Sequence, residues 1–246
     1  MIKMIKASQL ASCVGKNQYC SVKEALIRLW HDNHPLEHVP VKFCTPDMIV
    51  ESCISENLRS NLLREDADAE KIVEAVFKTS TEEPSTLISR QQLIDAVDRV
   101  ISTTKGIRGE QSTLDMYACR RSVRVKEGND RVRKFPIQPR WWLVGVTDAY
   151  HENALLPSII EVKTRRNHLF QEIPEYEKVQ LHAYMYIYRC TSITWVQRFG
   201  DIVTWKDVSW DKHLWNEILT GVRDFCVKYN EIDAMNIKDR TEWMED

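Results

Sequence analysis

The stretch Ser158-Ile-Ile-Glu-Val-Lys-Thr164 decides the fold, because two charged residues interrupt a run of apolar ones. Its β-branched residues predict a strand, in which successive side chains alternate between the two faces of a sheet. Glu161 and Lys163 therefore share one face, and Ile160 and Val162 point to the other. Burying two charges in an apolar strand costs free energy unless they pair or bind an ion. The pattern predicts a functional site, and its alternative is a Glu–Lys pair on a half-exposed sheet.

Polar residues accompany the neighbouring segments on both sides of this strand. Upstream, the apolar segment WWLVGVTDAY (141–150) is predicted to form one strand that Asp148 ends. Downstream, a helix predicted from about residue 174 to 189 carries Gln180 and Tyr184, which are four residues apart and share one helix face. The alternative for these two residues is simple packing of a helix against the core.

This combination of residues is suited to phosphodiester hydrolysis. Two carboxylates, Asp148 and Glu161, can hold Mg²⁺ or Mn²⁺ together with its waters, and the cation then polarises the phosphate. Lys163 can orient and activate the attacking water. The backbone carbonyl of Val162 lies between the charged pair and is predicted to be a further oxygen ligand.

The motifs follow one another in a characteristic order: Gly145-Val-Thr-Asp148, Glu161-Val-Lys163 and Gln180-Leu-His-Ala-Tyr184. This order resembles that of the RecB-like nucleases in the PD-(D/E)xK superfamily, whose pattern is GxxD, ExK and QxxxY. The resemblance implies an α/β, restriction-endonuclease-like core, a small mixed β-sheet flanked by helices, with a helical N-terminal region. It also implies catalytic roles for Asp148, Glu161, Lys163 and Gln180, supported by Tyr184.

Two earlier segments resemble the YqaJ-type viral recombinases and lambda exonuclease. The run from Lys6 to Tyr19 is similar to their N-terminal TAS…G…Y segment, which implies that Ser8 contacts a phosphate of the DNA end. The segment Gly106–Glu110 is similar to a stretch that opens a helix and supplies a metal-site carboxylate, here Glu110. An acidic residue there also fits plain helix capping. The arginine that precedes the serine in the relatives would fall at or before Met1, so Lys6, Lys16 or another arginine would have to replace it.

By resemblance, the activity is Mg²⁺-dependent exonucleolytic hydrolysis of linear double-stranded DNA, 5′ to 3′, in recombination, repair or viral DNA processing. The implied partners are duplex DNA ends, a single-strand annealing protein and further copies of the chain in a trimer. Two alternatives stay open: an endonuclease or repair nuclease of the same superfamily, and a catalytically inactive DNA-binding module. The intact Asp148, Glu161 and Lys163 argue against the inactive module, because buried charges are costly to keep.

Composition restricts where DNA can bind. The formal net charge is −2, so no global basic field attracts nucleic acid, and binding must come from local patches such as the basic stretch 120–140. The residues predicted to contact DNA phosphates are Lys6, Ser8, Arg121, Arg124, Arg165 and Arg166. The seven cysteines lack CxxC spacing, which favours a reducing compartment and predicts no iron–sulfur cluster. No apolar run is long enough to span a bilayer, so we expect a soluble intracellular protein, compatible with a viral protein in a host cell.

The chain is expected to form a single nuclease domain over residues 1–246. Residues 1–105 are predicted to be mostly helical, 106–210 to form the catalytic core, and 211–246 to hold a C-terminal helix from about 211 to 229. Within the first region, helices are expected after Ser21, from Pro46 through residue 63, at 67–78 and at 91–103. A further helix is expected to begin near Gly109, in the predicted core. A hairpin is expected around Gly200-Asp201.

Overall fold

The computed structural model describes residues 2–34, 44, 46–64, 66–79, 88–128, 132–152 and 158–245. The chain divides into two compact units, one of Glu37–Gly109 and the other of Met1–Leu36 with Glu110–Asp246. The boundary between the units falls inside one long helix, α6 (Arg90–Arg121). All the predicted site residues lie in the second of these units.

The unit Glu37–Gly109 is helical, as predicted. It contains α3 (Pro46–Cys53), α4 (Glu56–Arg59), the 3-10 helix η3 (Ser60–Leu63), α5 (Ala69–Thr79) and the first part of α6. Pro46 begins α3 as expected, but the prediction of one helix through residue 63 is wrong, because the backbone of Ser55 is extended and starts a new short helix. The core of the unit is aliphatic and is formed by Val50, Ile54, Leu62, Ala69, Ile72, Val73, Val76, Leu93, Ala96, Val97 and Ile101.

The prediction of separate helices at 91–103 and from Gly109 is also wrong, because α6 is continuous from Arg90 to Arg121. The hydroxyls of Thr103 and Thr104 donate to the carbonyls of Arg99 and Val100, four residues earlier, so these threonines fit the helix instead of ending it. Glycine inside a helix costs only about 1 kcal/mol, and α6 contains no proline, which would cost about 3.

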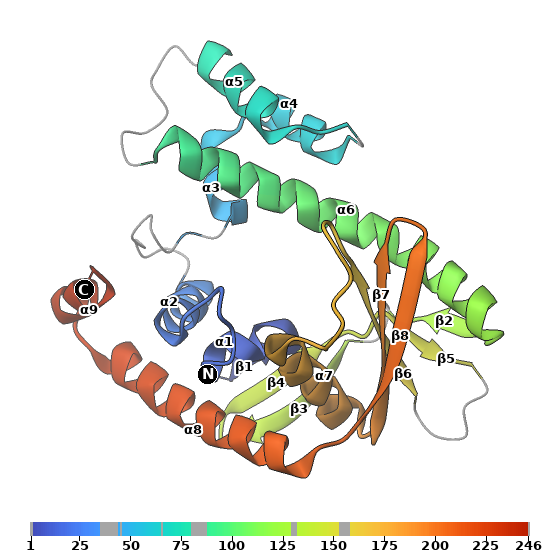
Figure 1. Ribbon diagram of the computed structural model, residues 1–246. Helices are drawn as coiled ribbons and strands as arrows, with labels where there is room; N and C mark the ends of the chain where they lie inside the picture. Colours follow the sequence, from blue (N-terminus) through green and yellow to red (C-terminus); the bar gives the residue numbers. More distant parts are fainter. Residues whose placement is uncertain are drawn as a thin grey trace. The chain divides into compact units, whose positions relative to one another are not determined.

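The other unit contains two sheets, and the predicted α/β class with mixed sheets flanked by helices is confirmed (Figure 1). One has the order β1 (Lys3–Lys6), β4 (Trp141–Gly145), β3 (Arg133–Gln138). The other has the order β2 (Val125–Glu127), β5 (Ala149–His151), β6 (Ile159–Thr164), β7 (Ser192–Phe199), β8 (Ile202–Ser209). Strands β1 and β4 pair in parallel, as do β6 and β7, and the other pairs are antiparallel.

Two strand predictions need correction. The segment 141–150 is two strands, β4 and β5, which belong to different sheets, so Asp148 lies in the break between them and directly precedes β5. Strands β1 and β3 were not predicted: β1 is only four residues long, and Pro136 interrupts the strand pattern of β3, where the register shifts. The β7–β8 hairpin turns at Gly200, as predicted.

Helix α7 (Glu175–Tyr188), which was predicted almost to the residue, contacts β3 and β4 of one sheet and β7 of the other (Figure 1). The 3-10 helix η1 (Ala7–Gln9) and α1 (Leu10–Cys13) also contact α7. Helix α2 (Val22–Asn33) begins with the predicted Ser21 cap, which forms a full capping box with Glu24.

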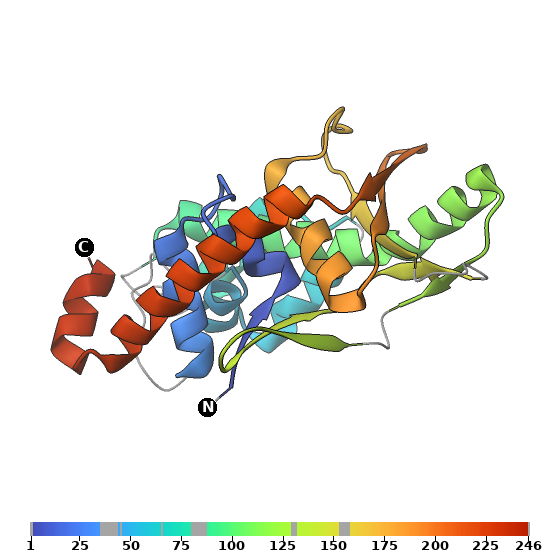
Figure 2. The ribbon, with the colours of Figure 1, turned by 90° about the horizontal axis from the view of Figure 1, so that it is seen from below.

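The C-terminal helix is longer than predicted. Helix α8 (Lys212–Ala234) runs past α1 and α2, and α9 (Ile237–Glu245) follows it (Figure 2). Asp211 caps α8 by accepting the backbone N–H groups of His213 and Leu214. Within the described part of the chain, none of the helices has the length and apolar character needed to cross a membrane.

Candidate active site

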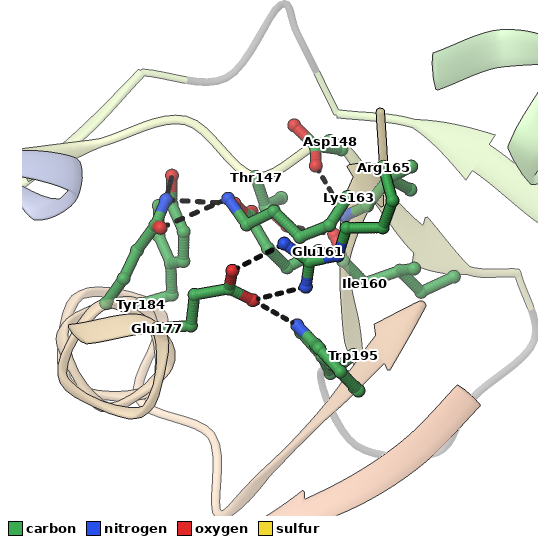
Figure 3. Close-up of polar contacts among 11 residues, drawn as sticks. Thr147, Asp148, Ile160, Glu161, Lys163, Arg165, Glu177, Tyr184 and Trp195 are labelled. Carbon is green, nitrogen blue, oxygen red and sulfur yellow. Dashed lines mark hydrogen bonds and ion pairs between the residues drawn. The ribbon is translucent and has the colours of Figure 1, made fainter. Parts of the chain in front are cut away.

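Asp148 lies in the break between β4 and β5, and hydrogen bonds from neighbouring elements hold this break in place. The Thr147 hydroxyl donates to the Ile160 carbonyl at 2.8 Å, and the Thr147 N–H donates to the Tyr188 hydroxyl at 3.1 Å. Oδ2 of Asp148 accepts the backbone N–H of Val162 at 2.6 Å. The carboxylate is therefore fixed beside the middle of β6 (Figure 3).

Glu161 and Lys163 lie on the same face of β6, as predicted, and form an ion pair with each other (Figure 3). Gln180 forms hydrogen bonds with both of them. Lys163 Nζ donates to Glu161 Oε1 at 2.7 Å and to Gln180 Oε1 at 3.1 Å. Gln180 Nε2 donates to the same Glu161 oxygen at 2.9 Å and to the Tyr184 hydroxyl at 3.2 Å. The structure thus brings together four of the residues that the motifs predicted.

The pKa values of the two carboxyl groups, Glu161 and Asp148, are raised. Burial raises the pKa of Glu161 to about 8, and the nearby charge of Asp148 adds to this effect, while Lys163 opposes it. Burial also raises the pKa of Asp148 to about 6, against the Val162 N–H, which favours the ionised form. Burial favours the neutral amine of Lys163, but the charge and hydrogen bond of Glu161, together with the charges of Glu177 and Asp148, raise the lysine pKa. The single positive charge of Lys163 therefore lies beside two carboxyl groups, those of Asp148 and Glu161.

One carboxylate oxygen of this site has no hydrogen-bond partner in the part of the chain that the structure describes. Glu161 is 3% exposed, and its Oε2 is buried without a hydrogen-bond partner among the described residues. An unpaired buried acceptor is costly, and a bound cation would satisfy it. Carboxylate oxygens are the ligands that Mg²⁺ prefers, so the residues present fit such an ion.

The predicted third carboxylate, Glu110, is half-buried on α6 and senses the site electrostatically. Burial raises its pKa, with a further contribution from the charge of Glu161, and Glu110 in turn raises the pKa of Asp148. Across the described ranges, no group of three or more His, Cys, Asp or Glu side chains forms a preformed metal cage. Any ion held here would depend on Asp148 and Glu161 with waters and backbone oxygens.

Scans against protein-family models and against curated proteins found no match to the chain. Among solved structures, it is similar to the alkaline exonuclease LHK-Exo of Laribacter hongkongensis. The complex of LHK-Exo with dAMP has 12% identity and a TM-score of 0.49, over 92% of this chain and 88% of that chain. A phage-related exonuclease from Haemophilus somnus 129PT has 13% identity and a TM-score of 0.46, over 95% and 96%. At this level of similarity, only the side chains of the site bear on its chemistry.

The residues predicted to contact DNA fall into two groups. Lys6, Ser8, Arg124 and Arg166 are exposed. Lys6 pairs in register with Val144, close to the break that holds Asp148, so the N-terminal motif reaches the site side of β4.

Arg121 and Arg165 are already bound by carboxylates. Arg121 forms two hydrogen bonds with Asp207, at 3.0 and 2.6 Å, and Arg165 forms two with Glu177, at 2.7 and 2.9 Å. Their predicted phosphate contacts would therefore compete with these ion pairs. Residues 129–131 of the basic stretch lie outside the described part of the chain.

Several residues that shape the site were not predicted, among them Thr147, Tyr188, Glu177 and Gly128. Gly128 donates its N–H to the Asp148 carbonyl at 2.9 Å. The signal for Glu177 is present in the sequence: it precedes Gln180 by three residues and so shares its helix face.

Proposed function

We propose that this chain is a metal-dependent deoxyribonuclease. The observation that carries the proposal is the buried Oε2 of Glu161, which has no partner among the described residues in a site that also holds Asp148 and Lys163. Paired carboxylates beside a lysine supply what phosphodiester hydrolysis needs: ligands for a cation and a group that orients water. Leaving a buried carboxylate oxygen unpaired costs free energy, which a bound cation would offset.

The proposed cofactor is Mg²⁺, for which Mn²⁺ would substitute. Asp148 and Glu161 would hold it, with Glu110 and the Val162 carbonyl as further oxygen ligands. Mg²⁺ typically keeps several waters and binds one or two carboxylates together with substrate phosphates, which suits a site without a complete protein cage. When bound, the ion polarises the scissile phosphate and stabilises charge on the leaving oxygen.

The side chains around Lys163 fix the direction of its ammonium group. Two of its three N–H bonds are directed to Glu161 and Gln180, which leaves the third to orient the attacking water. Gln180 holds both members of the ion pair, and the Tyr184 hydroxyl accepts from the Gln180 amide and so sets its orientation. We assign Asp148, Glu161, Lys163 and Gln180 to catalysis and Tyr184 to support.

The proposed substrate is linear duplex DNA, degraded from its ends in the 5′ to 3′ direction during recombination, repair or viral DNA processing. Exposed Ser8 and Lys6 would contact the end, and Arg124 and Arg166 the flanking phosphates. Phosphate contacts by basic side chains make binding salt-dependent. A single-strand annealing protein and two further copies of the chain are the proposed partners.

Digestion of linear and circular duplex DNA tests this proposal. Linear substrates would carry 5′-phosphate or 5′-hydroxyl ends, and each substrate would be incubated with Mg²⁺ or with EDTA. The variant Asp148→Ala would be compared with Asp224→Ala, a control at an exposed aspartate. We expect metal-dependent loss of 5′-phosphorylated linear DNA, abolished only by Asp148→Ala. Cutting of closed circles would instead establish an endonuclease. Binding without any cleavage would establish an inactive DNA-binding module.

A further inference from the structure

A second buried ion pair lies next to the proposed catalytic residues (Figure 3). Arg165 donates from both terminal nitrogens to the two oxygens of Glu177, at 2.7 and 2.9 Å, in the bidentate geometry that is strongest for this pair. The side chains are 11% and 3% exposed. The Trp195 indole N–H donates to Glu177 Oε2 at 2.7 Å, so both carboxylate oxygens are bonded.

The guanidinium of Arg165 is fixed by further contacts. Its Nε donates to Gln197 Oε1 at 3.1 Å, and its charged group lies 4.6 Å from the centre of the Phe170 ring. Gln197 also accepts the backbone N–H of Phe170 at 3.0 Å and donates to its carbonyl at 2.7 Å. Arg165 therefore has a defined orientation in which its planar group faces Glu177, and a DNA phosphate would have to displace that carboxylate.

The position of this pair connects two elements of the catalytic site. Arg165 follows Lys163 by two residues and directly follows β6, and Glu177 precedes Gln180 by three residues in the first turn of α7. The pair thus ties the end of β6 to the beginning of α7. Gln180 reaches Glu161 and Lys163 only if that turn of α7 is held close to the sheet, because its contacts with them are 2.9 and 3.1 Å long.

We infer that Arg165 and Glu177 are positioning residues for hydrolysis: their ion pair, with Trp195 and Gln197, sets the distance from α7 to β6 so that Gln180 holds Lys163 and Glu161. The catalytic part of this inference rests on the proposed nuclease function. The rival role for Arg165 is direct contact with a DNA phosphate.

Enzyme kinetics on linear duplex DNA separate the two roles. The variants are Arg165→Gln, Glu177→Gln and the double variant, with the exposed pair Lys228→Gln and Glu231→Gln as the matched control. If the pair positions α7, each single variant lowers kcat at least about 10-fold with little change in KM. The double variant lowers kcat no further, because the two single variants and the double variant all remove the same Arg165–Glu177 contact. The salt dependence of DNA binding stays as in the wild type.

A phosphate contact predicts a different set of results. Arg165→Gln alone would then raise KM and reduce the slope of log K against log salt by about one, while Glu177→Gln would leave kcat unchanged. That outcome would overturn the inference. Each single variant leaves one charge buried without its partner and could fail to fold for that reason. The double variant removes both charges and then provides the test. A folded double variant with the kcat of the wild type also overturns the inference.

A structural measurement keeps this inference distinct from the nuclease proposal. NMR of the full-length, metal-free protein follows the Gln180 side-chain amide and the Trp195 indole N–H. Positioning predicts that Glu177→Gln moves both signals, whereas a local packing role moves the indole signal alone. If the wild type cleaves no DNA, the proposed function fails, yet the Gln180 signal still shows whether the pair positions α7.

Discussion

Replacing Gly145 with alanine tests how closely α7 approaches the strand that leads to Asp148. A Cβ atom at residue 145 would lie 2.8 Å from Cε1 of Tyr184 and 3.1 Å from Cδ1 of Ile187. Carbon atoms pack at about 3.5–4.0 Å, so the Tyr184 ring or α7 must retreat by about 0.7 Å. Tyr184 is 6% exposed and cannot turn into solvent, so this overpacking is expected to cost about 1–3 kcal/mol.

The retreat should affect both stability and catalysis. A loss of about 2 kcal/mol corresponds to a fall in Tm of about 4–8 °C for a chain of this size. Because the Tyr184 hydroxyl accepts from Gln180, the shift also moves the Gln180 amide away from Glu161 and Lys163. Misplacement of this order lowers kcat by roughly 10- to 100-fold. Thermal unfolding and initial rates on 5′-phosphorylated linear duplex DNA measure the two effects.

Gly106→Ala is the matched control, because the same methyl group there meets no described atom within 4 Å other than its chain neighbours and the backbone of its own helix. Gly106 lies inside α6, where alanine favours the helix by about 1 kcal/mol, so stability should rise and kcat stay unchanged. If Gly145→Ala has the Tm and kcat of the wild type, the close approach of α7 to β4 does not set the position of Gln180.

Three further changes have defined outcomes. Gly128→Ala would place a Cβ 2.4 Å from the Thr147 carbonyl oxygen and should displace the break that holds Asp148. In the same rate assay it should lower kcat more than Gly145→Ala does, and equal rates would contradict this. Burial lowers the pKa of His182, whose neutral ring accepts the Asp211 N–H at 3.0 Å, so its contribution to stability is complete above about pH 6.5 and is lost as pH falls through the lowered pKa. Urea unfolding between pH 5 and 8 should show this loss, and His182→Gln should flatten it. Removing the capping hydroxyl of α2 with Ser21→Ala should cost about 1 kcal/mol in urea unfolding and leave the cleavage rate unchanged, and a lost rate would place α2 in the site.

The parts of the site that the sequence predicts are those whose geometry is local. Alternation along β6 is enough to place Glu161 and Lys163 on one face, and the spacing along α7 is enough to place Gln180 and Tyr184 together. Both elements are also rich in apolar residues, which is why the sequence predicts them. Only the arrangement of α7 beside β6 needed the motif order.

The features of the site that the sequence did not predict depend on contacts between residues far apart in the chain. Nothing in WWLVGVTDAY marks the break before Asp148, because the groups that stabilise it are the Tyr188 hydroxyl and the Ile160 carbonyl, on other elements. Likewise, nothing in the sequence marks Glu177 as the ion-pair partner of Arg165, and only the fold shows it. The sequence pattern shows where a charged side chain lies, but only the tertiary structure shows which residue it pairs with.

The two neighbouring ion pairs differ in one respect that separates their roles. Buried ion pairs contribute little net stability, because desolvation offsets the attraction, so each needs another reason to be there. In the pair of Glu177 with Arg165, both carboxylate oxygens have N–H donors, and nothing is left to bind. In the pair of Glu161 with Lys163, one oxygen accepts two donors and the other accepts none among the described residues. A fully bonded pair is suited to holding position, whereas the unbonded buried oxygen of Glu161 fits the cation proposed for this site.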